Sequence, residues 1–177
     1  MAGTGIGTGS DGFPTSARDA VSTLFHLHHK RLVGLASLLV DDHGTAEEIV
    51  QDAFESLYKR WNGLRDPNAA VAYLDRSVVY GARSWVRRRV TARSFTPPEA
   101  GVEISAENHA VDSRRNDELA DAIRGLPQRQ REVVVLRYYL DLSEEQIATW
   151  LGVSTGSVKK HAFRATAALQ RRMEAWA

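Results

Sequence analysis

Three basic side chains and one aromatic ring recur at helical spacing near the end of this 177-residue chain. Lys159 and Lys160 precede Phe163 and Arg164, and residues three or four apart lie on one side of a helix. Cationic groups neutralise DNA phosphates, and a phenyl ring can pack on a thymine methyl group. These residue types predict a DNA-binding face. A solvated basic face is the alternative, but such a face has little use for an exposed phenyl ring.

The residues around this face predict two short helices joined by a tight turn. Ser143 and Gln146 have the spacing of a capping box at the start of the first helix. Gly152 ends that helix, and Ser154 opens the second. We interpret residues 141–173 as a helix-turn-helix, whose second helix fits the major groove of DNA. Apolar stripes would hold the two helices together: Ile147, Ala148 and Leu151 on the first, and Val158, Ala162, Ala165 and Leu169 on the second.

A second basic row lies on a long helix predicted from about Ala69 to Val90. Arg76, Tyr80, Arg83 and Arg87 follow one another at intervals of four, three and four residues, so they share one face. Guanidinium groups bind phosphates and a tyrosine ring can stack on a base, which suits single-stranded or partly opened nucleic acid. The alternative is a solvated arginine-rich helix.

An acidic surface is predicted on an earlier helix, which Thr45 would cap. Its apolar positions run from Ile49 to Trp61 at helical spacing and predict a buried face. The opposite face predicts either a docking surface for a basic partner or a merely solubilising surface. It carries Glu48, Gln51, Asp52 and Glu55.

Composition excludes several classes of function. The formal net charge is only +1, so charge is segregated along the chain rather than basic overall. The absence of cysteine excludes disulfides and zinc ribbons. We interpret His26, His28 and His29 as packed or surface side chains, because no carboxylate is placed to complete a metal site. No motif for an enzyme is present, which predicts no cofactor and no small-molecule substrate. No membrane-spanning run or signal-peptide core is present, which predicts a cytoplasmic protein.

The pattern along the chain predicts an all-α protein with two small helical domains joined by a flexible linker. Residues 1–16 are rich in glycine and threonine and predict a disordered tail. Residues 17–92 form the first predicted domain, and residues 93–116, which contain prolines and few apolar side chains, form the linker. Residues 117–177 form the second domain, which contains the helix-turn-helix.

Three stretches together resemble the extracytoplasmic-function (ECF) group of bacterial RNA polymerase sigma factors, of the actinobacterial type. They are HGTAEEIVQDAFESLYKRW, the helix end SWVRRR, and LPQRQREVVVLRYYLDLSEEQIATWLGVSTGSVKKHAFRATAAL. The resemblance spans about residues 17–173, and the last stretch is its most specific part. It implies a dissociable subunit that binds core polymerase, recognises the −35 and −10 promoter elements and helps to initiate transcription.

The resemblance also implies a partner for each surface. The acidic surface would dock on the coiled coil of the polymerase β′ subunit, the second domain would bind promoter DNA beside the β flap, and an anti-sigma factor would mask both domains. For the −10 single strand it implies Asn62, Arg65, Arg76, Tyr80, Arg83 and Arg87. For the −35 duplex it implies Ser154, Thr155, Ser157, Lys159, Lys160, Phe163 and Arg164.

The chain departs from the family pattern at three positions. Tyr80 stands where the long helix of the family often has asparagine, which affects the choice of −10 bases. His161 and Thr166 replace arginines that are common in relatives, and lost phosphate contacts there would weaken non-specific attraction to DNA.

Two other readings compete with the sigma factor. An autonomous helix-turn-helix regulator would bind an operator without polymerase, but it would need a dimer, and no heptad seam is visible. An interaction protein would keep the acidic surface and lack promoter function.

Overall fold

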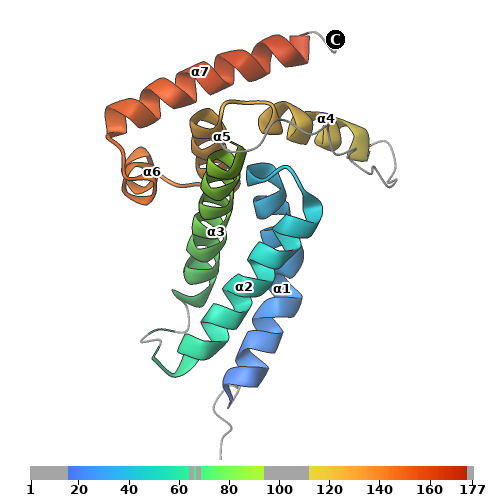
Figure 1. The fold of residues 1–177 in the computed structure, drawn as a ribbon, viewed down its shortest axis with the longest axis vertical. Coiled ribbons are helices and arrows are strands. Elements are labelled where there is room, and N and C mark those ends of the chain that lie inside the picture. Colours follow the sequence, from blue (N-terminus) through green and yellow to red (C-terminus); the bar gives the residue numbers. More distant parts are fainter. Residues whose placement is uncertain (1–15, 64–65, 67–68, 94–111, 175–177) are drawn as a thin grey trace, which may run out of the picture.

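The computed structural model describes residues 16–63, 66, 69–93 and 112–174, and within these ranges the chain is helical with no strand. The all-α prediction is therefore confirmed. The predicted tail up to residue 15 and the linker residues 94–111 lie outside the described part. Figure 1 shows the order of the helices, and no described helix is long and apolar enough to cross a membrane.

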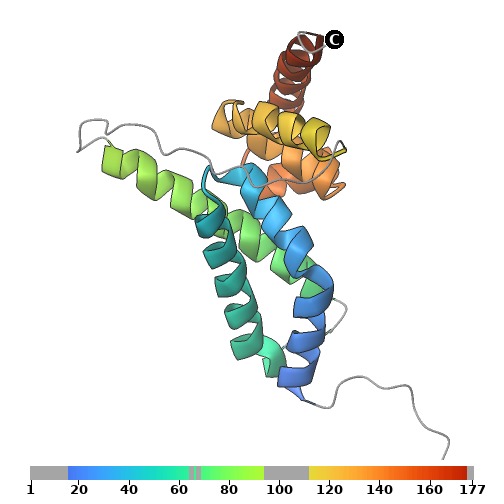
Figure 2. The same ribbon diagram turned by 90° about the vertical axis from the view of Figure 1, so that its right-hand side faces the viewer.

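The first half of the described chain is a bundle of three long helices (Figures 1 and 2). A short 3-10 turn, η1, follows the second helix. Leucine and valine side chains at helical spacing close the bundle, and Leu32, Leu57 and Leu74 are fully buried. The elements are α1 (Ala17–Leu39), α2 (His43–Arg60), η1 (Trp61–Gly63) and α3 (Ala70–Arg93).

The residue that caps α2 is Asp42, and the predicted cap at Thr45 was wrong. The Asp42 carboxylate accepts hydrogen bonds from the Thr45 backbone N–H and from its hydroxyl, both at 2.7 Å. These two bonds lower the pKa of Asp42. Aspartate and threonine are both good N-cap residues. In this helix the N-cap is Asp42, which lies three residues before Thr45.

The second half contains four helices and a π-helical turn, η3, which continues α5 without a break. Helix α4 begins at Asp112, so residues 112–116 of the predicted linker are helical. Both views place these elements at one end of the three-helix bundle (Figures 1 and 2). The elements are α4 (Asp112–Arg124), α5 (Gln128–Val134), η3 (Val135–Tyr139), α6 (Glu144–Leu151) and α7 (Thr155–Glu174).

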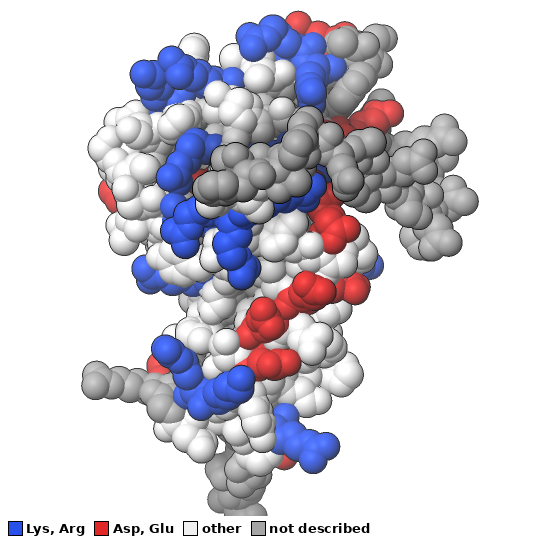
Figure 3. Space-filling view, viewed as in Figure 1, with Lys and Arg blue, Asp and Glu red and all other residues white. Residues whose placement is uncertain are grey.

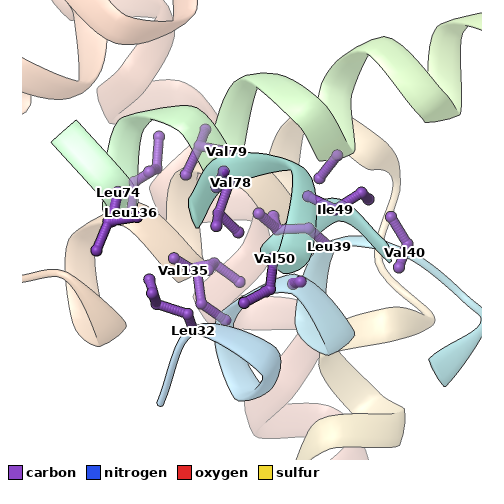
Figure 4. Packing of buried hydrophobic residues seen from close by; sticks show 14 of the residues in the cluster. Leu32, Leu39, Val40, Ile49, Val50, Leu74, Val78, Val79, Val135 and Leu136 are labelled. Atoms are coloured by element: carbon purple, nitrogen blue, oxygen red, sulfur yellow. The ribbon is translucent and has the colours of Figure 1, made fainter. Parts of the chain in front are cut away.

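The core joins the two halves. Val135 and Leu136, from the second half, lie in the same buried apolar cluster as Leu32 and Leu39 of α1 and Val78 of α3. Figure 4 shows these side chains together. The two helical regions therefore pack on each other through a shared core.

Candidate nucleic-acid and protein-binding surfaces

The helix-turn-helix forms as its local signals predict. The Ser143 hydroxyl accepts from the Gln146 N–H at 3.2 Å, and the Gln146 side chain accepts from the Ser143 N–H at 2.8 Å. Gly152 ends α6 with φ of 66°, the left-handed conformation that glycine adopts without strain. Ser154 then accepts from the Ser157 N–H at 3.1 Å and opens α7.

Helix α7 presents the basic and aromatic face to solvent. Val158, Ala162 and Ala165 are buried against the rest of the fold, which turns the opposite side outward. That side carries Phe163, whose surface is 77% exposed. The remaining predicted residues of this face are all exposed: Lys159, Lys160 and Arg164.

The start of α7 adds polar groups beside this face. Ser154 and Thr155 are exposed, and the Ser154 hydroxyl donates to that of Ser157 at 3.1 Å. The first N–H groups of a helix carry partial positive charge and favour a phosphate. A duplex lying along α7 would thus meet hydroxyls and amides at one end and cations with a ring beyond them.

Helix α3 carries the second basic row, and two of its members contact each other. Arg76 donates from Nε and Nη2 to the Tyr80 hydroxyl at 3.3 and 3.2 Å, and its guanidinium lies 5.5 Å from the Tyr80 ring centroid. Arg87 and Asn62 are exposed, whereas Arg65 lies outside the described residues. The row thus presents guanidinium groups and a tyrosine ring. Proteins bind unpaired bases with groups of these kinds.

Arg83 is not free on this face, which the spacing along α3 alone did not predict. It donates from Nη1 to the Trp150 carbonyl at 2.9 Å and from Nη2 to the Leu151 carbonyl at 3.2 Å, both in the last turn of α6. Its Nε lies 3.6 Å from a carboxylate oxygen of the buried Glu132. The last carbonyls of a helix have no partner within the helix, so a guanidinium at that end satisfies them.

An open cleft of about 620 Å³ lies between α3 and α5, next to this contact. Arg83, Arg87 and Arg129 line it together with Tyr80. Figure 3 shows several basic side chains over the end of the molecule where Figure 1 places α5 and α7. Three of the residues that line the cleft are therefore arginines, and two of them, Arg83 and Arg87, belong to the basic row.

The acidic surface on α2 is solvent-exposed, and all four of its predicted residues lie outward. Figure 3 shows acidic side chains in a row over α2. Gln51 donates to Glu55 at 3.3 Å, and Lys59 lies 4.0 Å from the same carboxylate. Glu48 and Asp52 make no ion pair with any described residue, so their charges are available to a basic partner.

One of the histidines near the start of the chain packs on an aromatic side chain. His29 stacks on Phe25 with ring centroids 4.4 Å apart, and Phe25 packs on Phe54 of α2. Among the described residues no group of three histidine, aspartate or glutamate side chains is placed to hold a metal ion.

Family models match both helical regions. The model of sigma-70 region 2 matches residues 24–91, which run from α1 to α3. The model of sigma-70 region 4 matches residues 116–169, which run from α4 to α7 and contain the helix-turn-helix.

Curated proteins give the same family, and a solved structure shares the fold. The chain is 38% identical to an RNA polymerase sigma-E factor of Streptomyces antibioticus, over 77% of this chain and 74% of the relative. It is 30% identical to the ECF sigma factor SigM of Mycobacterium tuberculosis, over 87% and 77% of the two chains. The sigma factor RpoE of Bartonella quintana, solved with the anti-sigma factor NepR, shares the fold with a TM-score of 0.65 at 22% identity, over 86% of this chain and 96% of that one. The chain therefore belongs to the ECF group of sigma-70 RNA polymerase sigma factors.

Proposed function

We propose that this chain selects promoters for RNA polymerase by reading duplex DNA with α7 and holding a separated strand with α3. The observation that carries the proposal is the exposed face of Lys159, Lys160, Phe163 and Arg164 on the second helix of a helix-turn-helix. The matches to both sigma regions support the same function.

Duplex reading needs a rigid helix that fits the major groove. In α7 the capping serine and the buried alanines fix the helix, so the outward side chains are held in place before DNA arrives. Lysine and arginine position the helix on phosphates, and Phe163 supplies an apolar contact that distinguishes thymine from other bases. At the start of α7, a DNA phosphate is bound by the hydroxyl groups of Ser154, Thr155 and Ser157.

Strand capture needs groups that replace the stacking lost when a base leaves the duplex. Arg76 and Tyr80 already lie in contact, so one base can meet a ring and a guanidinium together. Arg83 and Arg87 extend the row along α3 for the phosphates. Asn62, together with Arg65, which lies outside the described residues, completes the set assigned to the −10 strand.

The acidic surface of α2 supplies the polymerase contact. Glu48, Gln51, Asp52 and Glu55 form an exposed carboxylate-rich strip that suits a basic partner, which we assign to the β′ coiled coil. The region from α4 to α7 would meet the β flap. One solved neighbour, the sigma factor RpoE of Bartonella quintana, was crystallised with the anti-sigma factor NepR, which supports a partner of that kind here.

The autonomous regulator is not favoured. An autonomous regulator would not explain why residues 24–91 match sigma-70 region 2. The two functions differ in whether specific DNA binding requires polymerase.

The test compares binding to fluorescent genomic promoter fragments by this chain alone, by core polymerase alone and by the two together. We expect sequence-specific retention only with both present, and weakened retention when Phe163→Ala replaces the natural chain. Specific, salt-resistant binding by the isolated chain, unchanged by polymerase, would instead establish the regulator.

A further inference from the structure

A carboxylate on α6 lies between two cationic side chains of the helix-turn-helix region. The Glu144 Oε1 accepts from Arg137 Nη1 of η3 at 3.1 Å, and its Oε2 lies 3.6 Å from Lys159 Nζ of α7. Figure 1 shows α6 beside the start of α7. Each oxygen therefore has its own cation, and Glu144 connects three elements that are separate in the sequence.

The position of Glu144 is fixed before DNA binds. Glu144 is the first residue of α6, and the capping box between Ser143 and Gln146 holds the backbone on either side of it. Its side chain is 25% exposed, whereas that of Lys159 is 69% exposed. The carboxylate is thus held by the fold, and the long lysine side chain is the partner that it guides.

Stability alone gives little reason for the pair of Glu144 and Lys159. An ion pair with an exposed lysine contributes little to the free energy of unfolding, because water screens the charges and the lysine side chain loses freedom. A carboxylate next to DNA also repels phosphates, which weakens binding. The pair therefore matters for the place in which it holds the Lys159 ammonium group.

Lys159 lies on the side of α7 that would face the bases. It is one turn after Thr155 and one turn before Phe163, so these three side chains form one line along the helix. In helix-turn-helix proteins, residues in the N-terminal part of the second helix contact base edges. Lys160 and Arg164 form a neighbouring line on α7 and remain for the phosphates.

We propose that Glu144 is a positioning residue that holds Lys159 on a base edge and away from the phosphates, and so sets a sequence preference. This inference rests on the function proposed for α7. The base that fits is guanine, because its N7 and O6 are two adjacent acceptors in the major groove and a lysine ammonium group can donate to both. Since Glu144 also repels phosphates, it lowers non-specific affinity and raises specificity.

The test compares variants of the full-length chain. Glu144→Gln keeps the shape of the side chain and removes its charge, and Glu144→Ala removes the whole carboxylate while placing a strong helix former there. Glu145→Gln is the matched control, because Glu145 is the next residue, is exposed and forms no ion pair with a described residue. Lys159→Met removes the ammonium group and keeps an unbranched side chain. Circular dichroism checks that each variant remains helical.

Two readouts are made on each variant. The first is the base preference at each position of the −35 element, obtained with core polymerase by sequencing the fragments that the complex retains from a transcribed promoter randomised over that element. The second is the slope of log affinity against log salt concentration, measured for the isolated chain on duplex DNA of unrelated sequence. A slope that is steeper by about 0.9 corresponds to one additional phosphate contact.

We expect the natural chain to prefer guanine at one position, and both Glu144 variants to reduce that preference about tenfold. They should also steepen the salt slope by about 0.9, because the released Lys159 reaches a phosphate. Lys159→Met should lose the same preference, and adding Glu144→Gln to Lys159→Met should reduce the preference no further. Glu145→Gln should match the natural chain in both readouts.

A guanine preference that survives in both Glu144 variants would overturn the positioning role. So would an equal loss in Glu145→Gln, a loss confined to positions that prefer another base, a further loss when Glu144→Gln is added to Lys159→Met, or an unchanged salt slope. Failure of the proposed function is a different result, because the natural chain with core polymerase would then transcribe no fragment and select no sequence.

Discussion

At the scale of single residues, Phe163 has the most exposed large apolar side chain in the described part of the chain, at 77%. It packs on no core residue, so its removal should leave the free energy of unfolding within about 0.5 kcal/mol of the natural value. If it contacts a thymine methyl group, Phe163→Ala should weaken promoter binding by about 1 kcal/mol. Thermal unfolding and titration of a promoter fragment with polymerase present measure the two quantities.

Met173→Ala is the control for this prediction, since Met173 is also exposed on α7 but lies beyond the basic face. The control should change neither stability nor binding. Equal binding by Phe163→Ala and the natural chain would remove Phe163 from the DNA contact.

Asp75 gives a prediction about pH. Its carboxylate accepts from Arg31 at 2.6 Å between α1 and α3. Burial raises the pKa of Asp75, and the hydrogen bond and charge of Arg31 oppose that rise only in part. The pKa is higher in the folded chain than in the unfolded chain, so the folded state binds the proton more tightly. This group therefore stabilises the fold increasingly as pH falls through its folded pKa, and that contribution is lost as pH rises.

Asp75→Asn removes this titration and keeps an oxygen that can accept from Arg31. The difference in unfolding free energy, natural chain minus variant, should increase as pH is lowered from about 7 toward 4. Urea unfolding at a series of pH values measures it. A difference that stays constant or decreases toward low pH would contradict the raised pKa.

At the scale of elements, α2 combines a buried apolar side with an acidic side that makes few contacts. Reversing two of its charges, in Glu48→Lys with Asp52→Lys, should abolish binding to core polymerase while the melting temperature changes little, because both side chains are exposed. Co-purification with core polymerase measures the loss. Asp117→Lys with Glu118→Lys, both exposed on α4, is the charge-matched control, and equal loss in that control would show a general charge effect.

Elements whose signals are local could be predicted from the sequence. The capping box at Ser143, the left-handed Gly152 and the buried stripe of Val158, Ala162 and Ala165 each depend on residues a few positions apart. Boundaries were less certain: Asp42 took the capping role predicted for Thr45, and α4 began at Asp112 within the predicted linker. Two alternative N-cap residues, or two alternative starts of a helix, differ by little free energy, so the sequence does not decide between them.

Contacts between distant segments could not be predicted in this way. The spacing along α3 placed Arg83 on the face of Arg76 and Tyr80, but its partners lie 49, 67 and 68 positions away, at Glu132, Trp150 and Leu151. A glutamate directly before the apolar run from Val133 to Leu136 was a signal for a buried charge. Such a charge requires a cation nearby, but the sequence does not say which one.

At the scale of the whole molecule, the surfaces that we assign to polymerase, duplex and single strand lie on three different helices that share one core. Several basic side chains lie over the end of the molecule where α5 and α7 lie, and acidic ones follow α2 (Figure 3). Under the proposed function, this separation of charge would let one chain bind an acidic polymer and a basic protein surface at the same time, although its formal net charge is only +1.

Run-off transcription tests the central claim most directly. Core polymerase, this chain and a pool of genomic promoter fragments are incubated with nucleotides, and the transcripts are sequenced. We predict transcripts from a small set of fragments that share two sequence elements, with none when the chain is omitted and few with Phe163→Ala or with the α2 double reversal. If the natural chain with active core polymerase started no RNA on any fragment, the assignment of α2, α3 and α7 to promoter selection would be contradicted.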